Sequence, residues 1–179
     1  MTNKLLVLSD MWGVKKGLWI TSYFGYLQQS YEIDFFDCQQ LAHVNELVGN
    51  KENLHKAFVE GGIDTAVAHL LKKINEPTDV LAFSTGGTIA YKAALQGLPV
   101  KSMTLVSATR IRLESERPEC EVNLIYGGND KYAPSDEWAN NLGLEKTIIP
   151  NFGHELYTDQ KIIDEVSLAL LEGVIKKAV

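Results

Sequence analysis

Short runs in which nearly every position is apolar recur along the chain. A half-solvated antiparallel sheet would show strict alternation of apolar and polar residues, whereas strands covered on both faces are apolar throughout. The runs therefore predict strands of a buried, mostly parallel sheet. The predicted strands are Lys4–Ser9, Tyr31–Asp37, Asp79–Ser84, Lys101–Ser107, Glu121–Gly128 and Lys146–Asn151.

Between these runs, apolar residues return every three or four positions, which is typical of helices that cover one face of a sheet. Trp19, Tyr23, Tyr26 and Leu27 form one such stripe. An Ala-rich segment stops at Gly97, with a proline two residues beyond, a common end of a helix. The predicted helices are Leu18–Ser30, Leu54–Lys73, Gly86–Gln96, Pro134–Leu142 and a last helix carrying Ile163, Val166, Leu170 and Val174.

Strands and helices alternate, which implies βαβ units and a doubly wound α/β sheet of about six strands with helices on both faces. Residues 1–179 contain no repeat, low-complexity tract or linker, so a single domain is expected. Sheets of this kind bind ligands beyond the carboxyl ends of their strands. The polar residues directly after each predicted strand are therefore the candidates for function.

Three of these residues have the chemistry of a nucleophile, an acid and a base. Ser84 follows the third predicted strand, Asp130 the fifth and His154 the sixth. A serine hydroxyl needs an adjacent base before it attacks, and an imidazole takes up and returns a proton near neutral pH. An aspartate fixes the tautomer of that imidazole. Together they predict a Ser–His–Asp triad.

The segment around Ser84 also suits a nucleophile on a sharp strand-to-helix turn. Such a turn is strained, and the residues two positions before and after the nucleophile must be small. Here they are Ala82 and Gly86, so AFSTG stands for the usual G-x-S-x-G. The amide of Thr85, at the start of the helix, is expected to donate one hydrogen bond to an oxyanion.

A second oxyanion donor is expected from the loop after the first strand. Met11 is the first candidate there, and Trp12 is the next. Aromatic side chains on neighbouring loops are expected to shield the site from water. The predicted pocket residues are Asp10, Trp12, Tyr132 and Phe152.

With Ser84, Asp130 and His154 in this order, the chain resembles the α/β-hydrolase superfamily over nearly its whole length. The resemblance implies a minimal member without a cap domain, because only about fifteen residues separate the fourth and fifth strands. The segments LSDMWGVKKGLW, STGG, GGNDKYAP and GHELY are also similar to the dienelactone hydrolase-like branch. That branch has a cysteine nucleophile, whereas this chain has a serine. The branch resemblance implies that Asp10 contacts Ser84, although a plain loop carboxylate is the alternative.

Other residues are either rival catalytic candidates or are assigned a structural role. Asp136 is the nearest rival to Asp130 for the acid, whereas no other histidine follows His154. Cys38 is expected to be a buried, inert thiol. Solvated positions are expected for His43, His55, His69 and the mixed-charge stretch Arg110–Arg117.

Charge and composition limit the partners. A net charge of −6 argues against a nucleic acid or an anionic membrane, either of which would favour a basic face. No apolar run approaches the roughly 20 residues of a membrane span. Two cysteines without metal-site spacing predict neither a metal nor a disulfide framework, and no cofactor is expected. Free thiols and an N-terminal run too short for a signal peptide predict a cytoplasmic protein.

The sequence thus predicts a serine hydrolase of a small carboxylic ester or thioester, acting through Ser84, His154 and Asp130 and an acyl-enzyme. A catalytically silent binding protein of the same fold is one alternative, and its three side chains would lie too far apart for hydrogen bonds. An acyltransferase or peptidase with the same triad is the other. No basic cluster marks a phosphate or coenzyme A site along the sequence, and no pattern indicates an oligomeric state.

Overall fold

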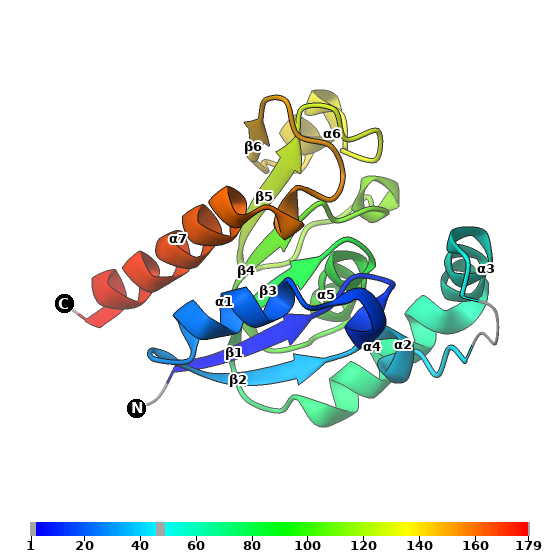
Figure 1. Ribbon diagram of the computed structural model, residues 1–179, viewed down its shortest axis with the longest axis horizontal. Helices are drawn as coiled ribbons and strands as arrows, with labels where there is room; N and C mark the ends of the chain where they lie inside the picture. The colour runs from blue at the N-terminus through cyan, green and yellow to red at the C-terminus, as the bar shows by residue number, and fades with distance from the viewer. Residues whose placement is uncertain (1–2, 46–48, 179) are drawn as a thin grey trace.

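The sheet predicted from the apolar runs is present. The structure, a computed structural model, describes residues 3–45 and 49–178. All neighbouring strands pair in parallel, in the order β2-β1-β3-β4-β5-β6 (Figure 1). The strands are β1 Asn3–Leu8, β2 Tyr31–Phe36, β3 Thr78–Phe83, β4 Val100–Val106, β5 Glu121–Gly127 and β6 Lys146–Ile149.

Helices cover both faces of this sheet, as a doubly wound fold requires. In Figure 1, α1 and α7 lie in front of the strands, whereas α4 and α5 lie behind them. The segment between β4 and β5 holds one short 3₁₀ turn and no cap domain. The helices are α1 Ile20–Leu27, α2 Cys38–Leu41, α3 Lys51–Ala57, α4 Ile63–Lys73, α5 Thr85–Leu95, α6 Asp136–Asn141 and α7 Gln160–Ala178.

The central strands are apolar throughout because they contribute to two separate cores. Leu5 and Val7 of β1 pack with the residues of α1 and α7. Leu6 and Leu8 pack with those of α4 and α5 on the opposite face. All four side chains are completely buried. Successive residues of a strand point to opposite faces, so a strand covered on both sides shows no polar alternation.

The helix predicted over residues 54–73 is wrong as a single element. It is divided into α3 and α4 by a π turn, in which Gly61 has φ 144°. Only glycine adopts that conformation readily, so the helix changes direction there. Helix α3 also begins earlier than expected, because the Asn50 side chain accepts a 2.8 Å hydrogen bond from the Asn53 amide and caps it. The result places α3 beyond the carboxyl ends of β1 and β2 (Figure 1).

The remaining predicted helices are present with shifted ends. Helix α1 is shorter than the apolar stripe suggested, and α6 begins only after Ser135, whose hydroxyl accepts a 3.1 Å hydrogen bond from the Trp138 amide. Within the stripe of α1, Tyr23 and Leu27 are buried, whereas Tyr26 reaches across to bond Asp164 of α7. In the described ranges, no helix combines the length and apolarity needed to cross a bilayer.

Candidate active site

Ser84 lies on a sharp turn between β3 and α5. Its φ of 50° and ψ of −117° are rarely adopted by residues with a side chain. The turn is held in place by Ser84 itself, whose amide donates a 2.9 Å hydrogen bond to the carbonyl of Val106. Gly86 passes so close to the end of β1 that a Cβ there would lie 2.2 Å from the carbonyl oxygen of Ser9. The close approach therefore requires a glycine at position 86.

A continuous chain of hydrogen bonds joins the three residues predicted from separate strand ends. Ser84 Oγ lies 2.8 Å from His154 Nε2, and His154 Nδ1 lies 3.0 Å from Asp130 Oδ2. The side chain of Asp130 is completely buried, and that of His154 is 23% exposed. With Nδ1 protonated and donating to Asp130, Nε2 accepts the hydrogen bond of the serine hydroxyl.

The loops that carry the acid and the histidine are fastened to each other. The amide of Asn129 donates a 2.9 Å hydrogen bond to the carbonyl of Phe152. Gly127 makes this possible, because a Cβ there would lie only 2.3 Å from the same carbonyl oxygen. The second carboxylate oxygen of Asp130 accepts a 2.9 Å hydrogen bond from the amide of Tyr132. The Tyr132 amide thus orients the carboxylate, and the bond between Asn129 and Phe152 holds its loop against the loop of His154.

Two backbone amides near Ser84 are available for an oxyanion. Within the described part of the chain, neither the Met11 amide nor the Thr85 amide donates a hydrogen bond. The amide of Trp12 donates a 3.0 Å hydrogen bond to Asp10 Oδ1, which removes it as a donor. The geometry thus favours Met11 over Trp12 as the partner of Thr85.

Asp10 is buried beside these amides. Its carboxylate accepts hydrogen bonds from the Trp12 amide and from the hydroxyl of Tyr157, the latter at 3.1 Å. Removal from water raises the pKa of Asp10 to about 6, and the two hydrogen bonds offset part of that rise. Both carboxylate oxygens are thus bonded to Trp12 and Tyr157 rather than to Ser84, although Asp10 and Ser84 line the same pocket.

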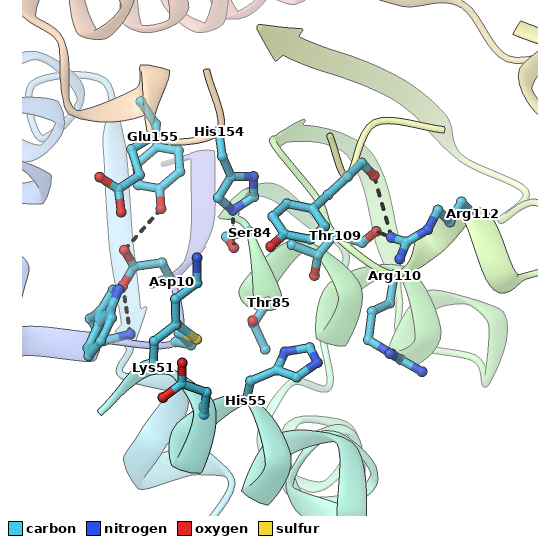
Figure 2. A pocket seen from close by; sticks show the side chains of 15 residues that line it. Asp10, Lys51, His55, Ser84, Thr85, Thr109, Arg110, Arg112, His154 and Glu155 are labelled. Atoms are coloured by element: carbon cyan, nitrogen blue, oxygen red, sulfur yellow. Dashed lines mark hydrogen bonds between the residues drawn. The ribbon is translucent and has the colours of Figure 1, made fainter. Parts of the chain in front are cut away.

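The pocket around Ser84 has a volume of about 380 Å³ (Figure 2). Phe152 does not line it, so that prediction is wrong. Its side chain packs against the core formed with α1 and α7, while its carbonyl holds the acid loop. The predicted residues that do line the pocket are Asp10, Met11, Trp12, Ser84, Thr85, Tyr132 and His154.

Other pocket residues were not predicted. Lys51 and His55 come from α3, which reaches the site only because the chain breaks at Gly61. Arg110 and Arg112 lie in the stretch expected to be solvated. The rule that ligands bind after parallel strands could have indicated Arg110, which follows β4 closely. The full set of unpredicted lining residues is Lys51, Glu52, His55, Thr109, Arg110, Arg112, Glu155 and Tyr157.

The cysteines take no part in this site. Cys38 is completely buried, and its thiol donates a 3.0 Å hydrogen bond to the carbonyl of Ser9. Burial raises its pKa, which disfavours the reactive thiolate. Among the residues that the structure describes, no group of three or more His, Cys, Asp or Glu side chains is placed to hold a metal ion.

Comparison with known proteins identifies the fold. No protein-family model and no curated protein matches the sequence. Among solved structures, the chain is similar to MGS-MChE2, an α/β-hydrolase enzyme from the metagenome of lagoon sediments of Mar Chica, Morocco. The TM-score is 0.69 at 14% identity, over 100% of this chain and 93% of that one. The mouse α/β-hydrolase domain-containing protein 10 gives 0.68 at 13%, over 100% and 92%.

A third similar structure is a Klebsiella pneumoniae protein provisionally assigned as a dienelactone hydrolase. Its TM-score is 0.69 at 14% identity, over 97% of this chain and 87% of that one. At identities this low the likeness concerns the fold rather than the chemistry. The chain has the α/β-hydrolase fold, without a cap domain.

Proposed function

We propose that this chain is a serine hydrolase that cleaves a small carboxylic ester or thioester through Ser84, His154 and Asp130. The observation that carries the proposal is the unbroken line of hydrogen bonds from Ser84 Oγ through His154 to Asp130, at 2.8 and 3.0 Å. Ser84 itself lies on a strained turn and lines the pocket. This combination of nucleophile, base and orienting acid is the arrangement that acyl transfer requires.

In the first half of the reaction, Ser84 Oγ attacks the acyl carbon and its proton passes to His154 Nε2. Asp130 stabilises the resulting imidazolium through the Nδ1 hydrogen bond. The negative charge on the former carbonyl oxygen is stabilised by the amides of Met11 and Thr85, each worth roughly 10²–10³-fold in rate at such sites. When the tetrahedral intermediate collapses, the leaving alcohol or thiol takes the proton from His154.

In the second half, water replaces the leaving group. His154 removes a proton from that water as it attacks the acyl carbon of the Ser84 ester. The new tetrahedral intermediate uses the same two amides, and its collapse returns the proton from His154 to Ser84 Oγ. The products are a carboxylic acid and the regenerated serine.

A catalytically silent binding protein is the second candidate, and Asp10 favours it. Above pH 6 a buried carboxylate beside the amides of Met11 and Thr85 opposes the charge that develops there during catalysis. Against it stands the short contact between Ser84 and His154, because a silent protein has no need to preserve it. The triad supports the enzyme more strongly than Asp10 supports the alternative.

The test is the Ser84→Ala variant assayed with short 4-nitrophenyl esters. We expect its turnover to fall by about 10³-fold or more, since removal of any triad member leaves only the oxyanion amides and binding. A fluorophosphonate probe should label the unmodified protein at Ser84 alone. Ser22→Ala, a change on α1 outside the pocket, is the matched control and should retain full turnover. Equal turnover in Ser84→Ala and the unmodified protein would exclude the proposal.

A further inference from the structure

Basic side chains from two distant segments meet at the pocket. Lys51 and His55 project from α3, whereas Arg110 and Arg112 follow β4. The sequence has only three arginines and a net charge of −6, so two arginines at one pocket are a local concentration against an acidic background. Figure 2 shows His55 below the pocket and both arginines on its right side.

Within the described residues, neither Arg110 nor Arg112 is paired with an acidic side chain. No ion pair involves Arg110 or Arg112 within the described ranges, and the guanidinium of Arg110 makes no hydrogen bond there. Arg112 Nη1 donates to the backbone carbonyls of Thr109 and Tyr132, which orients its guanidinium without neutralising it. Both side chains are only partly exposed. A partly buried, unpaired guanidinium loses hydration without compensation, so such residues commonly serve to bind an anion.

The third arginine shows what a structural role requires in this fold. Arg117 lies in the same mixed-charge stretch but is exposed and does not line the pocket. Its guanidinium donates a 2.8 Å hydrogen bond to the carbonyl of Gly143 and thereby ties two loops together. The guanidinium of Arg110 makes no comparable contact in the described ranges. Its position at the pocket therefore has no structural explanation of this kind.

Three acidic residues line the pocket: Glu52 comes from α3 with Lys51, whereas Asp10 and Glu155 lie across Ser84 from the arginines. In Figure 2, Asp10 and Glu155 are to the left of the serine, and Arg110 and Arg112 are to its right. A substrate with an anionic end is therefore repelled from one wall and attracted to the other. Ser84 lies between Asp10 and Glu155 on one side and the two arginines on the other, so these charges favour one orientation of a bound anion.

We propose that the preferred substrates are short esters or thioesters that carry a carboxylate or phosphate group, bound by the guanidinium groups of Arg110 and Arg112. Guanidinium presents paired N–H donors that match both anions. The pocket volume of about 380 Å³ is near the lower end for small-molecule sites and suits a compact substrate. The inference rests on the proposed serine hydrolase for its reaction but concerns binding, so it is testable without turnover.

The first experiment measures binding to the Ser84→Ala variant by titration calorimetry. Monomethyl glutarate, an anion, is compared with neutral dimethyl glutarate, and methyl 4-phosphonobutanoate tests phosphate-like groups against carboxylate. We expect at least one anionic ester to bind 10-fold or more tighter than the neutral ester. Adding Arg110→Gln should reduce that preference at least fivefold. The guanidinium of Arg110 makes no hydrogen bond in the described structure, and Gln keeps the backbone contacts of this position with Thr88 and Leu113, so the variant should fold normally.

The control and the contrary result are separate from those of the hydrolase proposal. Lys101→Gln removes an exposed positive charge from β4, outside the pocket, and should leave the preference intact. If both anionic esters bind no better than the neutral one, or if Arg110→Gln leaves their preference unchanged, the inference is wrong. Such a result would not test the hydrolase proposal, which depends on the labelling of Ser84 and the turnover of neutral esters. Conversely, arginine-dependent binding supports the inference even if Ser84 proves unreactive.

Discussion

The floor and the rim of the pocket are built differently. The floor, formed by Ser84, His154 and Asp130, has every functional atom engaged in a hydrogen bond, and its acid is completely buried. The rim, formed by Lys51, His55, Arg110 and Arg112, has basic side chains without acidic partners in the described ranges and lies on a separate helix and loop.

This difference separates reaction from selection. Acyl transfer requires the floor groups at fixed distances before the substrate arrives, so the fold holds them with backbone contacts. A positively charged rim residue needs only to contact a bound anion, and an acidic partner in the free protein would compete with that anion. Changes to the floor should therefore alter the rate for every substrate, and changes to the rim should alter the choice among substrates.

The largest expected effect comes from the floor. Asp130→Asn removes the charge that stabilises the imidazolium and allows the wrong tautomer of His154. We expect kcat for 4-nitrophenyl esters to fall by about 10³–10⁴-fold, with neutral and anionic esters affected alike. Steady-state kinetics on both kinds of ester measures this.

Asp136→Asn is the matched control for that change. Asp136 is the rival acid in the sequence, but its side chain is 87% exposed and pairs at 2.8 Å with Lys146, whose side chain is 8% exposed. Asp136 does not line the pocket around Ser84, so activity should be unchanged. A large activity loss in Asp136→Asn together with an active Asp130→Asn would reverse the assignment of the acid.

A smaller effect is expected at Asp10, a buried residue of the same pocket. Because its pKa is about 6 in the folded chain, against an ordinary value of 3.8 for a solvated aspartate, the folded state binds more protons between these values. The contribution of Asp10 to the free energy of unfolding is therefore largest below pH 4 and is lost as the pH rises through about 6. The loss amounts to at most about 3 kcal/mol, at 1.36 kcal/mol per pKa unit.

Asp10→Asn should remove that dependence. We expect urea unfolding of the variant at pH 7.5 to require about 1–2 kcal/mol more than that of the unmodified chain, since the amide loses one hydrogen bond but carries no buried charge. Between pH 4 and pH 7 its stability should decline less. Asp34→Asn, an exposed change on β2, serves as the control and should keep the original pH slope. An unchanged slope in Asp10→Asn would show that Asp10 is not the titrating group.

The smallest expected effect concerns salt and distinguishes the rim from the floor. The Debye length is about 30 Å at 0.01 M salt and about 3 Å at 1 M, so partly exposed rim charges are screened and buried floor contacts are not. We expect the ratio of kcat/KM for an anionic ester to that for its neutral counterpart to fall about two- to fivefold from 0.02 to 0.5 M NaCl. The neutral ester alone should change little. A constant ratio would contradict the role given to the rim charges.

Much of the fold followed from local patterns. Runs such as Lys4–Ser9 are apolar at every core position, and this predicted a sheet covered on both faces. The prediction of one helix over residues 54–73 is wrong because Gly61, with φ 144°, turns the chain. The sequence shows that a glycine is present but not which φ it adopts. The prediction that Phe152 lines the pocket is wrong for a related reason. The direction of a loop side chain depends on the residues that pack beside it, and Phe152 packs against the core.

The sequence by itself determined the six parallel strands and the order of Ser84, Asp130 and His154 at their ends. Parallel strands bring their carboxyl ends to one edge, so residues that follow different strands meet there whatever lies between them. Only the tertiary structure decided the rim, because Lys51 and Arg110 are brought together by the break between α3 and α4 and by the path after β4. It also decided that Asp10 bonds Trp12 and Tyr157. Those contacts depend on side-chain burial and close approach, which no spacing along the chain encodes.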